Sequence, residues 1–509
     1  MNKTLLFVCT FLLVSVSAFA QLDDIEFDGS NYLRFDNGRD VDQRRIGATN
    51  PDGSPVEYPD NTIARRFVED RLRLDLFSGN YHLGGRFLYF KPAESDVDQL
   101  GLVQENRFDK RFFEGQIHPL KFRFGHFSDI WASGLTFSSF ENRDLYFDSE
   151  LDGARVQVDA GSIKLIGLTG KTAQGPLVNE LTSTAGRIQL SPGAEHLGFS
   201  YAYNDSGFYS ESSVAGVDWN FTRGIFNLYG ERAWNEMILQ GGNSNGHATF
   251  VGVTVSKWGW SLLAQYADYA YNQVTPMQNP PTTYREVGPR LLQSRDPHVL
   301  NIPDEVGVQA ELSGSIGENT FVMGHYNANS HHNDEDESIP LPKLEEKFRP
   351  FWEMFGNVEH YFDGGQEVYV EVGANEEAAT EWQKRLWTQV RANFPFKGSQ
   401  EIEFETEQLF IKDKLKNDEK YHDMLYSVSW VPNGSFSINA AVQFTDDEAL
   451  QKREGNQWIS GEAAWKFSGG KHRAILFYGS ERGGLKCSNG VCRQVQAFSG
   501  LRLTLETSL

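Results

Sequence analysis

Two sets of charged residues occupy alternate positions along the chain, one set near its start and the other towards its end. Around Arg71 and Arg73 the sequence reads RLRLDLF, and around Glu403 and Glu405 it reads EIEFETE. Because successive side chains of a β-strand point to opposite faces, this spacing gives each segment one charged face and one apolar face. Rows of fixed charges are a means by which pores select or orient charged solutes. These residues are therefore suited to electrostatic selection.

The same alternation assigns further residues to two charged walls that face each other across a lumen. The predicted basic wall consists of Arg71, Arg73, Arg86, Arg107, Arg111, Lys121, Arg123 and Arg155. The predicted acidic wall consists of Glu367, Glu371, Glu401, Glu403, Glu405 and Glu407. Opposed walls would orient dipolar solutes. The alternative is that these charges only solvate a wet wall or pair with an inserted loop.

Covalent catalysis has little support in the sequence. It contains no phosphate-binding glycine loop, His-Glu-x-x-His zinc motif or dinucleotide fingerprint. Carboxylate pairs carry little weight in a chain with 69 acidic residues. We therefore assign no catalytic residue and no cofactor.

The cysteines and histidines suggest a disulfide but no metal site. Cys487 and Cys492 lie in the Gly-rich, polar stretch SERGGLKCSNGVCRQ, which predicts an exposed loop with a small disulfide; free thiols are the alternative. His331 and His332 precede an acidic run at 334–337. Such donors could hold a divalent cation, but their spacing matches no known metal loop and favours a solvated loop.

The elements that must position these residues are strands. Segments of about ten residues alternate apolar and polar side chains, and short turns rich in Gly, Pro and Asn alternate with long polar connections. In the last segment Leu501, Leu503 and Leu505 share one face. About 24 such segments (roughly 22–26) predict an all-β fold, a closed transmembrane antiparallel β-barrel of the outer-membrane type with long outer loops. A soluble β-sandwich would not explain the alternation of short and long connections.

Composition and the chain start support export. The chain has 509 residues and a formal net charge of −22, which argues against nucleic-acid binding. Residues 1–20 combine Lys3, an apolar run and the triplet Ala18-Phe19-Ala20, which predicts a signal peptide cleaved after Ala20. Residues 21–509 are then expected to form a single barrel. No later apolar stretch is long enough for a spanning helix.

Residues 125–153, hereafter the irregular segment, interrupt the strand rhythm with aromatic, small and acidic residues. A barrel of about 24 strands is wide, and large barrels are usually plugged. The segment therefore predicts a constriction folded into the lumen, with its acids meeting the basic wall; a surface loop is the alternative. The aromatic constriction candidates are Trp131, Phe137, Phe140 and Tyr146.

The stretch LKFRFGHFSDIWASGLTFSSFENRDLYFDSELDGARVQV and the terminal GSERGGLKCSNGVCRQVQAFSGLRLTL together resemble an uncharacterised family of outer-membrane barrels from Bacteroidota. Ala132 stands where that family commonly has the first Gly of a Gly-x-Gly turn. The resemblance implies a fold and a location in the outer membrane of a Gram-negative bacterium. It implies no chemistry.

We expect a porin-like channel or transport barrel, in which the irregular segment constricts a lumen between basic and acidic walls. A non-conducting structural or interaction barrel is the alternative, and an outer-membrane hydrolase is the least favoured one. The expected partners are outer-membrane lipid, the barrel-assembly machinery through the C-terminal strand, and a small polar solute.

Overall fold

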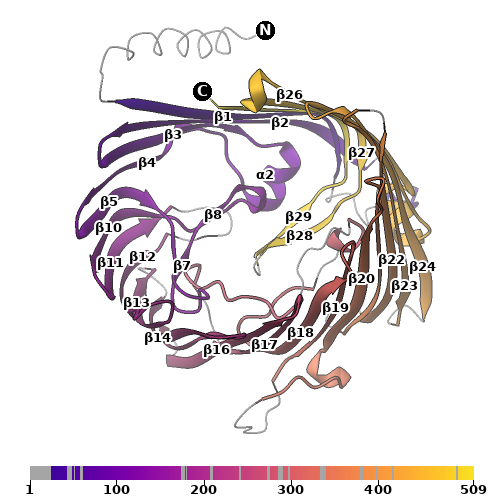
Figure 1. Cartoon of the computed structure of the whole chain (residues 1–509). Coiled ribbons are helices and arrows are strands. Elements are labelled where there is room, and N and C mark those ends of the chain that lie inside the picture. Colours follow the sequence, from indigo (N-terminus) through magenta and orange to yellow (C-terminus); the bar gives the residue numbers. More distant parts are fainter. Residues whose placement is uncertain are drawn as a thin grey trace.

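The chain folds into one closed antiparallel sheet of 24 strands (Figure 1). The computed structural model describes residues 25–42, 49–50, 52–57, 61–173, 178, 180–206, 210–239, 242–271, 275–284, 291–295, 298–332, 340–378, 382–396, 398–414, 418–488 and 491–508. The predicted signal peptide, residues 1–20, lies outside the described residues. The predicted fold class is confirmed.

Each barrel strand pairs with its neighbours along the chain. The first half contains β1 (Glu26–Val41), β2 (Thr62–Ser78), β3 (Tyr81–Lys91), β4 (Glu105–Ile117), β5 (Leu120–Phe127), β10 (Leu151–Ala160), β11 (Ile163–Thr172), β12 (Thr182–Leu190), β13 (His196–Asp205), β14 (Ser210–Arg223), β15 (Phe226–Leu239) and β16 (Gly242–Lys257). The second half contains β17 (Trp260–Ala270), β18 (Glu305–Ile316), β19 (Thr320–Ser330), β20 (Phe351–Tyr361), β21 (Glu367–Ala378), β22 (Trp382–Phe396), β23 (Gln400–Asp413), β24 (Glu419–Asn433), β25 (Phe436–Thr445), β26 (Gln457–Phe467), β27 (His472–Glu481) and β30 (Phe498–Ser508). Antiparallel pairing of β1 with β30 closes the barrel.

Side-chain alternation sets the two faces of each strand. On β2, Phe67 and Glu69 are buried on the inner face, whereas Leu72 and Leu74 have the opposite parity. The same rule leaves large apolar side chains exposed on the outer face, such as Leu312 and Val358. An outer apolar face and a polar inner face are the pattern expected of a barrel in lipid.

Short and long connections alternate over most of the barrel, as the sequence predicts, but the connections 206–209, 240–241 and 379–381 are short where a long one would be expected. Turns such as 79–80, 161–162 and 258–259 lie at one end, together with the start of β1 and the end of β30. We call this the turn end, and the opposite end the loop end. One predicted long connection, residues 232–246, is wrong, because β15 and β16 stay paired up to Leu239 and Gly242.

Several short elements from the loop end lie within the ring of strands. They are α2 (Glu94–Leu100), β6 (Asp129–Ile130), β7 (Ser138–Ser139), β8 (Glu141–Asn142), η2 (Arg143–Leu145), β9 (Phe147–Asp148), η3 (Gln293–Arg295), β28 (Gly484–Ser488) and β29 (Val491–Val495). Figure 1 shows α2, β7, β8 and the β28–β29 hairpin inside the ring. The remaining short elements are η4 (Glu346–Phe348), α3 (Glu448–Glu454) and η5 (Ser468–Gly470). Among the described residues, no helix is both long and apolar enough to cross a membrane.

Candidate functional site

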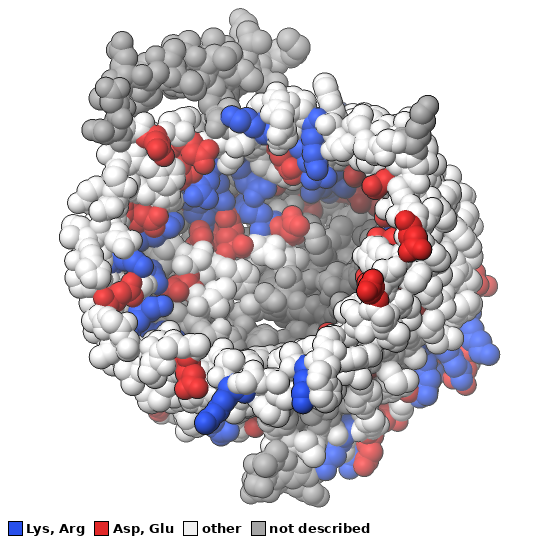
Figure 2. Space-filling model, in the orientation of Figure 1, with Lys and Arg blue, Asp and Glu red and all other residues white. Residues whose placement is uncertain are grey.

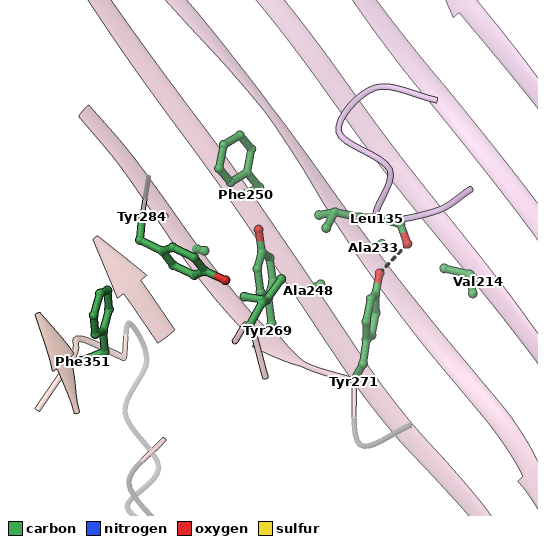
Figure 3. Packing of buried hydrophobic residues seen from close by; sticks show 11 residues of the cluster. Leu135, Val214, Ala233, Ala248, Phe250, Tyr269, Tyr271, Tyr284 and Phe351 are labelled. Atoms are coloured by element: carbon green, nitrogen blue, oxygen red, sulfur yellow. Dashed lines mark hydrogen bonds between the residues drawn. The ribbon is translucent and has the colours of Figure 1, made fainter. Parts of the chain in front are cut away.

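Glu231 on β15 fixes the irregular segment to the barrel wall. Its side chain is buried and accepts hydrogen bonds from the backbone N–H groups of Ser133 (2.9 Å), Leu135 (3.2 Å) and Thr136 (2.9 Å). The hydroxyl groups of Ser133 and Thr136 also donate to it, both at 2.7 Å. The Tyr271 hydroxyl donates to the Leu135 carbonyl at 2.8 Å (Figure 3). A charged acceptor makes these bonds stronger than those between neutral groups.

Apolar packing reinforces this anchor. Leu135 lies in a buried cluster with the small wall residues Val214, Ala233 and Ala248 (Figure 3). A second buried cluster contains Phe127, Trp131, Phe137, Leu151, Leu168, Leu181, Ala185, Ala202 and Met277. The segment therefore turns its large apolar groups towards the wall.

The four aromatic constriction candidates lie in these contacts. Trp131 and Phe137 are 2% and 0% exposed, so their rings anchor the segment and do not themselves line an opening. Phe140 packs against the buried cluster of Leu145, Phe147 and Val178, and Tyr146 packs against the cluster that contains Phe67, Leu88 and Phe90.

Charged residues of the irregular segment pair with the wall of β2 to β4 and β10. Glu141 binds Arg86 through two bonds of 2.6 and 2.7 Å, and Arg143 binds Glu69 at 2.9 Å. Burial raises the pKa of Glu141, but the hydrogen bonds and charge of Arg86 outweigh this effect and hold the pKa at about 2. Further pairs are Lys110–Glu150 at 2.8 Å and Arg155–Asp129 at 2.6 Å.

Most residues of the predicted basic wall lie on the inner face. The strand register places there Arg71, Arg73, Arg86, Arg107, Lys121, Arg123 and Arg155. Acids of the wall itself neutralise several of them: Asp75 lies 2.7 Å from Arg73, and Glu114 lies 3.0 Å from Arg123. Figure 2 accordingly shows blue and red side chains interspersed over β1 to β5. The wall is thus a network of ion pairs.

Arg111 is the exception, and its assignment to the basic wall is wrong. The pairing of β3 with β4 shifts register between Arg86 and Phe87, which leaves Asp109 as a bulge residue. Beyond this bulge Arg111 lies opposite Gly85 on the outer face, with the same parity as exposed Phe113, and its guanidinium is 3.7 Å from Asp152. A β-bulge inserts one residue and so reverses the alternation on which the assignment depended.

The residues of the predicted acidic wall also lie on inner faces, on β21 and β23. They are Glu367, Glu371, Glu401, Glu403, Glu405 and Glu407. Several are engaged by neighbours: Glu371 accepts from the Tyr369 hydroxyl at 2.7 Å and from Trp387 Nε1 at 3.0 Å, and Arg391 lies 3.4 Å from Glu367.

Glu407 has the same role for another loop that Glu231 has for the irregular segment. Its carboxylate accepts hydrogen bonds from the backbone N–H groups of Leu291 (2.6 Å) and Leu292 (2.8 Å), just before η3. Sequence reasoning did not identify Glu231, and it assigned Glu407 to the pore surface. A signal for Glu231 was present in the small residues around it on the inner wall, which leave room for a packed loop.

The β28–β29 hairpin contacts both loops. It lies against η2 of the irregular segment and, through β28, against η3. The expectation of a freely exposed loop is therefore wrong. The backbones of Cys487 and Cys492 are paired directly across the hairpin, but their side chains lie outside the described residues, so the disulfide stays a prediction.

His332 lies between two carboxylates at the loop end. Its Nδ1 is 2.7 Å from Asp304 and its Nε2 is 3.1 Å from Asp268, while His331 is 3.0 Å from Asp304. Burial lowers the pKa of His332, but these hydrogen bonds outweigh burial and raise it to about 9. Residues 334–337 lie outside the described residues, and the described part of the chain contains no group of three or more His, Cys, Asp or Glu side chains placed to hold a metal ion.

Ser244 lies in GNSNG, which fits the Gly-x-Ser-x-Gly spacing of a hydrolase nucleophile elbow. An elbow needs a sharp turn from a strand into a helix, whereas Ser244 is within β16 and pairs with Met237. This pentapeptide is therefore strand and not an elbow.

Comparisons with known proteins give a partial family match and similar barrels. The model of a family of unknown function (DUF6029) matches residues 368–509, which include the last hairpin but not the irregular segment. No curated protein matches the chain.

Among solved structures, the chain is similar to a chain of the E. coli P pilus tip assembly intermediate PapC-PapD-PapK-PapG, with 10% identity, a TM-score of 0.53, and coverage of 96% of this chain and 62% of that one. The P pilus usher (PapC) translocation pore has 8% identity and a TM-score of 0.48, and the match covers 95% of this chain and 99% of the usher chain. A BenF-like porin from Pseudomonas fluorescens Pf-5 has 8% identity and a TM-score of 0.39, and the match covers 71% of this chain and 97% of the porin chain. At 10% identity, the likeness to the first of these chains shows the barrel fold alone.

Proposed function

We propose that this protein is an outer-membrane channel for small polar solutes, narrowed by the irregular segment. The observation that carries the proposal is the anchoring of this segment inside a closed barrel of 24 strands by Glu231, which accepts hydrogen bonds from Ser133, Leu135 and Thr136. A loop fixed to one side of a wide lumen reduces the bore without blocking it. This is the arrangement by which pores set a size limit.

The charges of the lumen support selection by charge as a second element of the proposal. Inner-face acids concentrate on β21 and β23, while the cations of β2 to β5 and β10 lie in another part of the ring. Ion pairs such as Arg86–Glu141 weaken the net field on the cationic side. We therefore infer that selectivity depends on the cations left without a close carboxylate, and not on two uniformly charged walls.

Single-channel conductance in planar bilayers tests the proposal. Deleting residues 133–150 should leave a folded barrel and raise the conductance several-fold, because the bore widens. Glu231→Gln should also raise the conductance or its noise, because the amide has one acceptor oxygen in place of two and no charge. Glu318→Gln, at an exposed position in the turn between β18 and β19, is the matched control and should change nothing.

Two results would contradict the constriction. The deletion could barely change the conductance, or an external protease could readily cut the segment in intact cells. Either result would identify the segment as a surface loop.

The second candidate function is a non-conducting structural or interaction barrel. The contact of the β28–β29 hairpin with both η2 and η3 favours it, because three loops that meet inside the ring would obstruct the lumen more than one loop does. The same bilayer measurement separates the two functions. A wild-type barrel that conducts only after deletion of residues 484–495 would favour the plugged barrel.

A further inference from the structure

A cavity of about 470 Å³ lies on the seam where the barrel closes, at its turn end. The strands around it are β26, β27, β30, β1, β2 and β3, which are consecutive in the closed sheet (Figure 1). Six cations line it: Arg71, Arg73, Arg86, Lys466, Lys471 and Arg473. Glu506 is the single acid among its described lining residues.

The strand register shows that most of these cations occupy directly paired positions on neighbouring strands. Lys466 pairs with Arg473, Arg473 with Glu506, Glu506 with Tyr32, and Tyr32 with Arg71. Two residues nearer the turn end, on the same inner face, Arg73 pairs with Arg86. Like charges directly opposite each other destabilise a sheet. Carboxylates of the protein offset the cost of the Arg73–Arg86 pair, whereas a bound anion would offset the cost of the Lys466–Arg473 pair.

Arg73 and Arg86 have carboxylate partners of their own. Arg86 binds Glu141 and Asp109, and Arg73 binds Asp75. The excess positive charge of the cavity therefore comes from its other cations.

The remaining four cations have no carboxylate among the described residues closer than 3.6 Å. The Glu69 carboxylate is 2.9 Å from Arg143 but 3.6 Å from Arg71, so it neutralises Arg71 only in part. Arg473 is 3.6 Å from Glu506. Among the described residues, no carboxylate forms an ion pair with Lys466 or Lys471.

Two guanidinium groups also present buried donors without an acceptor. The Nε atoms of Arg71 and Arg473 are both buried and have no hydrogen-bond partner among the described atoms. A buried charged donor without an acceptor is costly. Arg71 stacks on the ring of Tyr32, with 4.1 Å between the guanidinium carbon and the ring centre, which fixes the plane in which its donors point.

We propose that this seam cavity binds a small free anion that carries two or more negative charges, on carboxylate or phosphate groups. Arginine forks bind the planar or tetrahedral oxygens of such groups, and the two lysines supply point charges. The volume is within the range of small-molecule sites. The ligand is a solute and not a lipid headgroup, because Arg71 and Lys466 face the lumen while their neighbours Leu72 and Trp465 have the outward parity.

This inference goes beyond the proposed function, because binding does not require conduction. Isothermal titration of the purified full-length barrel in a neutral detergent tests it, with citrate as the carboxylate probe and pyrophosphate as the phosphate probe. The double variant Lys466→Gln/Lys471→Gln should weaken binding of the preferred probe at least ten-fold, and both lysines are exposed, so the barrel should still fold.

Lys121→Gln is the matched control, since Lys121 is also on the inner face near the turn end but is neutralised by Asp159 at 3.0 Å. It should bind the probe as the wild type does. Absence of binding by both probes would overturn the proposal, as would equal weakening by the control and the double variant. A barrel that binds citrate but does not conduct would contradict the proposed channel function and leave the proposed anion site intact.

Discussion

At the scale of residues, carboxylates do more than charge the lumen of this barrel. Glu231 and Glu407 each accept hydrogen bonds from consecutive or nearly consecutive backbone N–H groups of a loop. Hydrogen bonds to a charged group contribute about 1.5–3 kcal/mol each, so a few of them can fix a loop that has little regular structure. An acid on the inner face of a strand can thus position a loop as well as attract a cation.

His332 gives a prediction for pH dependence. Its pKa in the folded protein is about 9, above the ordinary value of 6.5, so its two ion pairs stabilise the loop end fully below about pH 6.5 and are lost as the pH rises through about 9. The midpoint temperature of heat-induced unfolding should therefore fall between pH 7 and pH 10. In His332→Gln this fall should be smaller.

His118→Gln controls for the loss of a histidine, because His118 is exposed in the turn between β4 and β5. It should keep the wild-type pH dependence. The interpretation fails if His332→Gln and the wild type lose the same stability over this range.

Single residues also show where prediction from the sequence ends. Alternation placed Arg71, Arg73 and Arg86 on the correct face because their strands are regular. It failed at Arg111, because the bulge at Asp109 carries no strong sequence signal. It could not identify ion pairs such as Arg86–Glu141, since the partners come from distant segments whose approach depends on the whole fold.

At the scale of elements, a patch of small residues on the inner wall gives the irregular segment its place. Gly216, Ala233 and Ala248 lie side by side on β14, β15 and β16. Larger side chains there would fill the space that Leu135 and Thr136 occupy. The patch explains why this segment packs on this part of the ring.

Gly216→Ala tests the fit. A Cβ atom at Gly216 would lie 1.9 Å from Oγ1 of Thr136, so this hydroxyl must move and its hydrogen bond to Glu231 is disturbed. Overpacking of this kind costs about 1–3 kcal/mol. We expect faster proteolysis of the segment in the purified barrel.

Gly186→Ala is the matched control, because the nearest atom to a Cβ there is 3.8 Å away. It should keep the wild-type cleavage rate. If Gly216→Ala is cut no faster than this control, the close packing of Thr136 on β14 is wrong.

The β28–β29 hairpin carries the predicted disulfide between Cys487 and Cys492. A bridge across so short a loop stabilises the folded state by at most about 2–3 kcal/mol, so Cys487→Ser/Cys492→Ser should leave a folded barrel. Intact mass measured without reductant should be lower by two hydrogens than after reduction. Reaction of both thiols with a maleimide before reduction would disprove the bridge.

At the scale of the whole molecule, closure through β1 and β30 predicts the behaviour of the protein in the cell. A closed barrel resists detergent, so the protein should fractionate with the outer membrane and migrate differently on gels before and after heating. Deletion of Leu509 should lower the amount of assembled barrel without reducing export, if the last strand is the assembly signal. Recovery as a soluble periplasmic protein would contradict the membrane location.

The architecture could be predicted from the sequence because it depends on local signals. Alternation and turn residues repeat in every hairpin, and they gave the strand number and the two kinds of end. The interior could not be predicted in the same way. The inward course of the β28–β29 hairpin depends on its contacts with η2 and η3, which lie far away in the chain.

The pairing of the first strand with the last has a consequence for the order of assembly. β30 follows β29 after only two residues, so the hairpin reaches the nascent barrel together with the strand that closes it. Its contacts η2 and η3 belong to loops that lie far earlier in the sequence. Pairing of β30 with β1 therefore brings the hairpin to the rim beside the interior loops that it contacts, so closure of the barrel and packing of its interior are coupled.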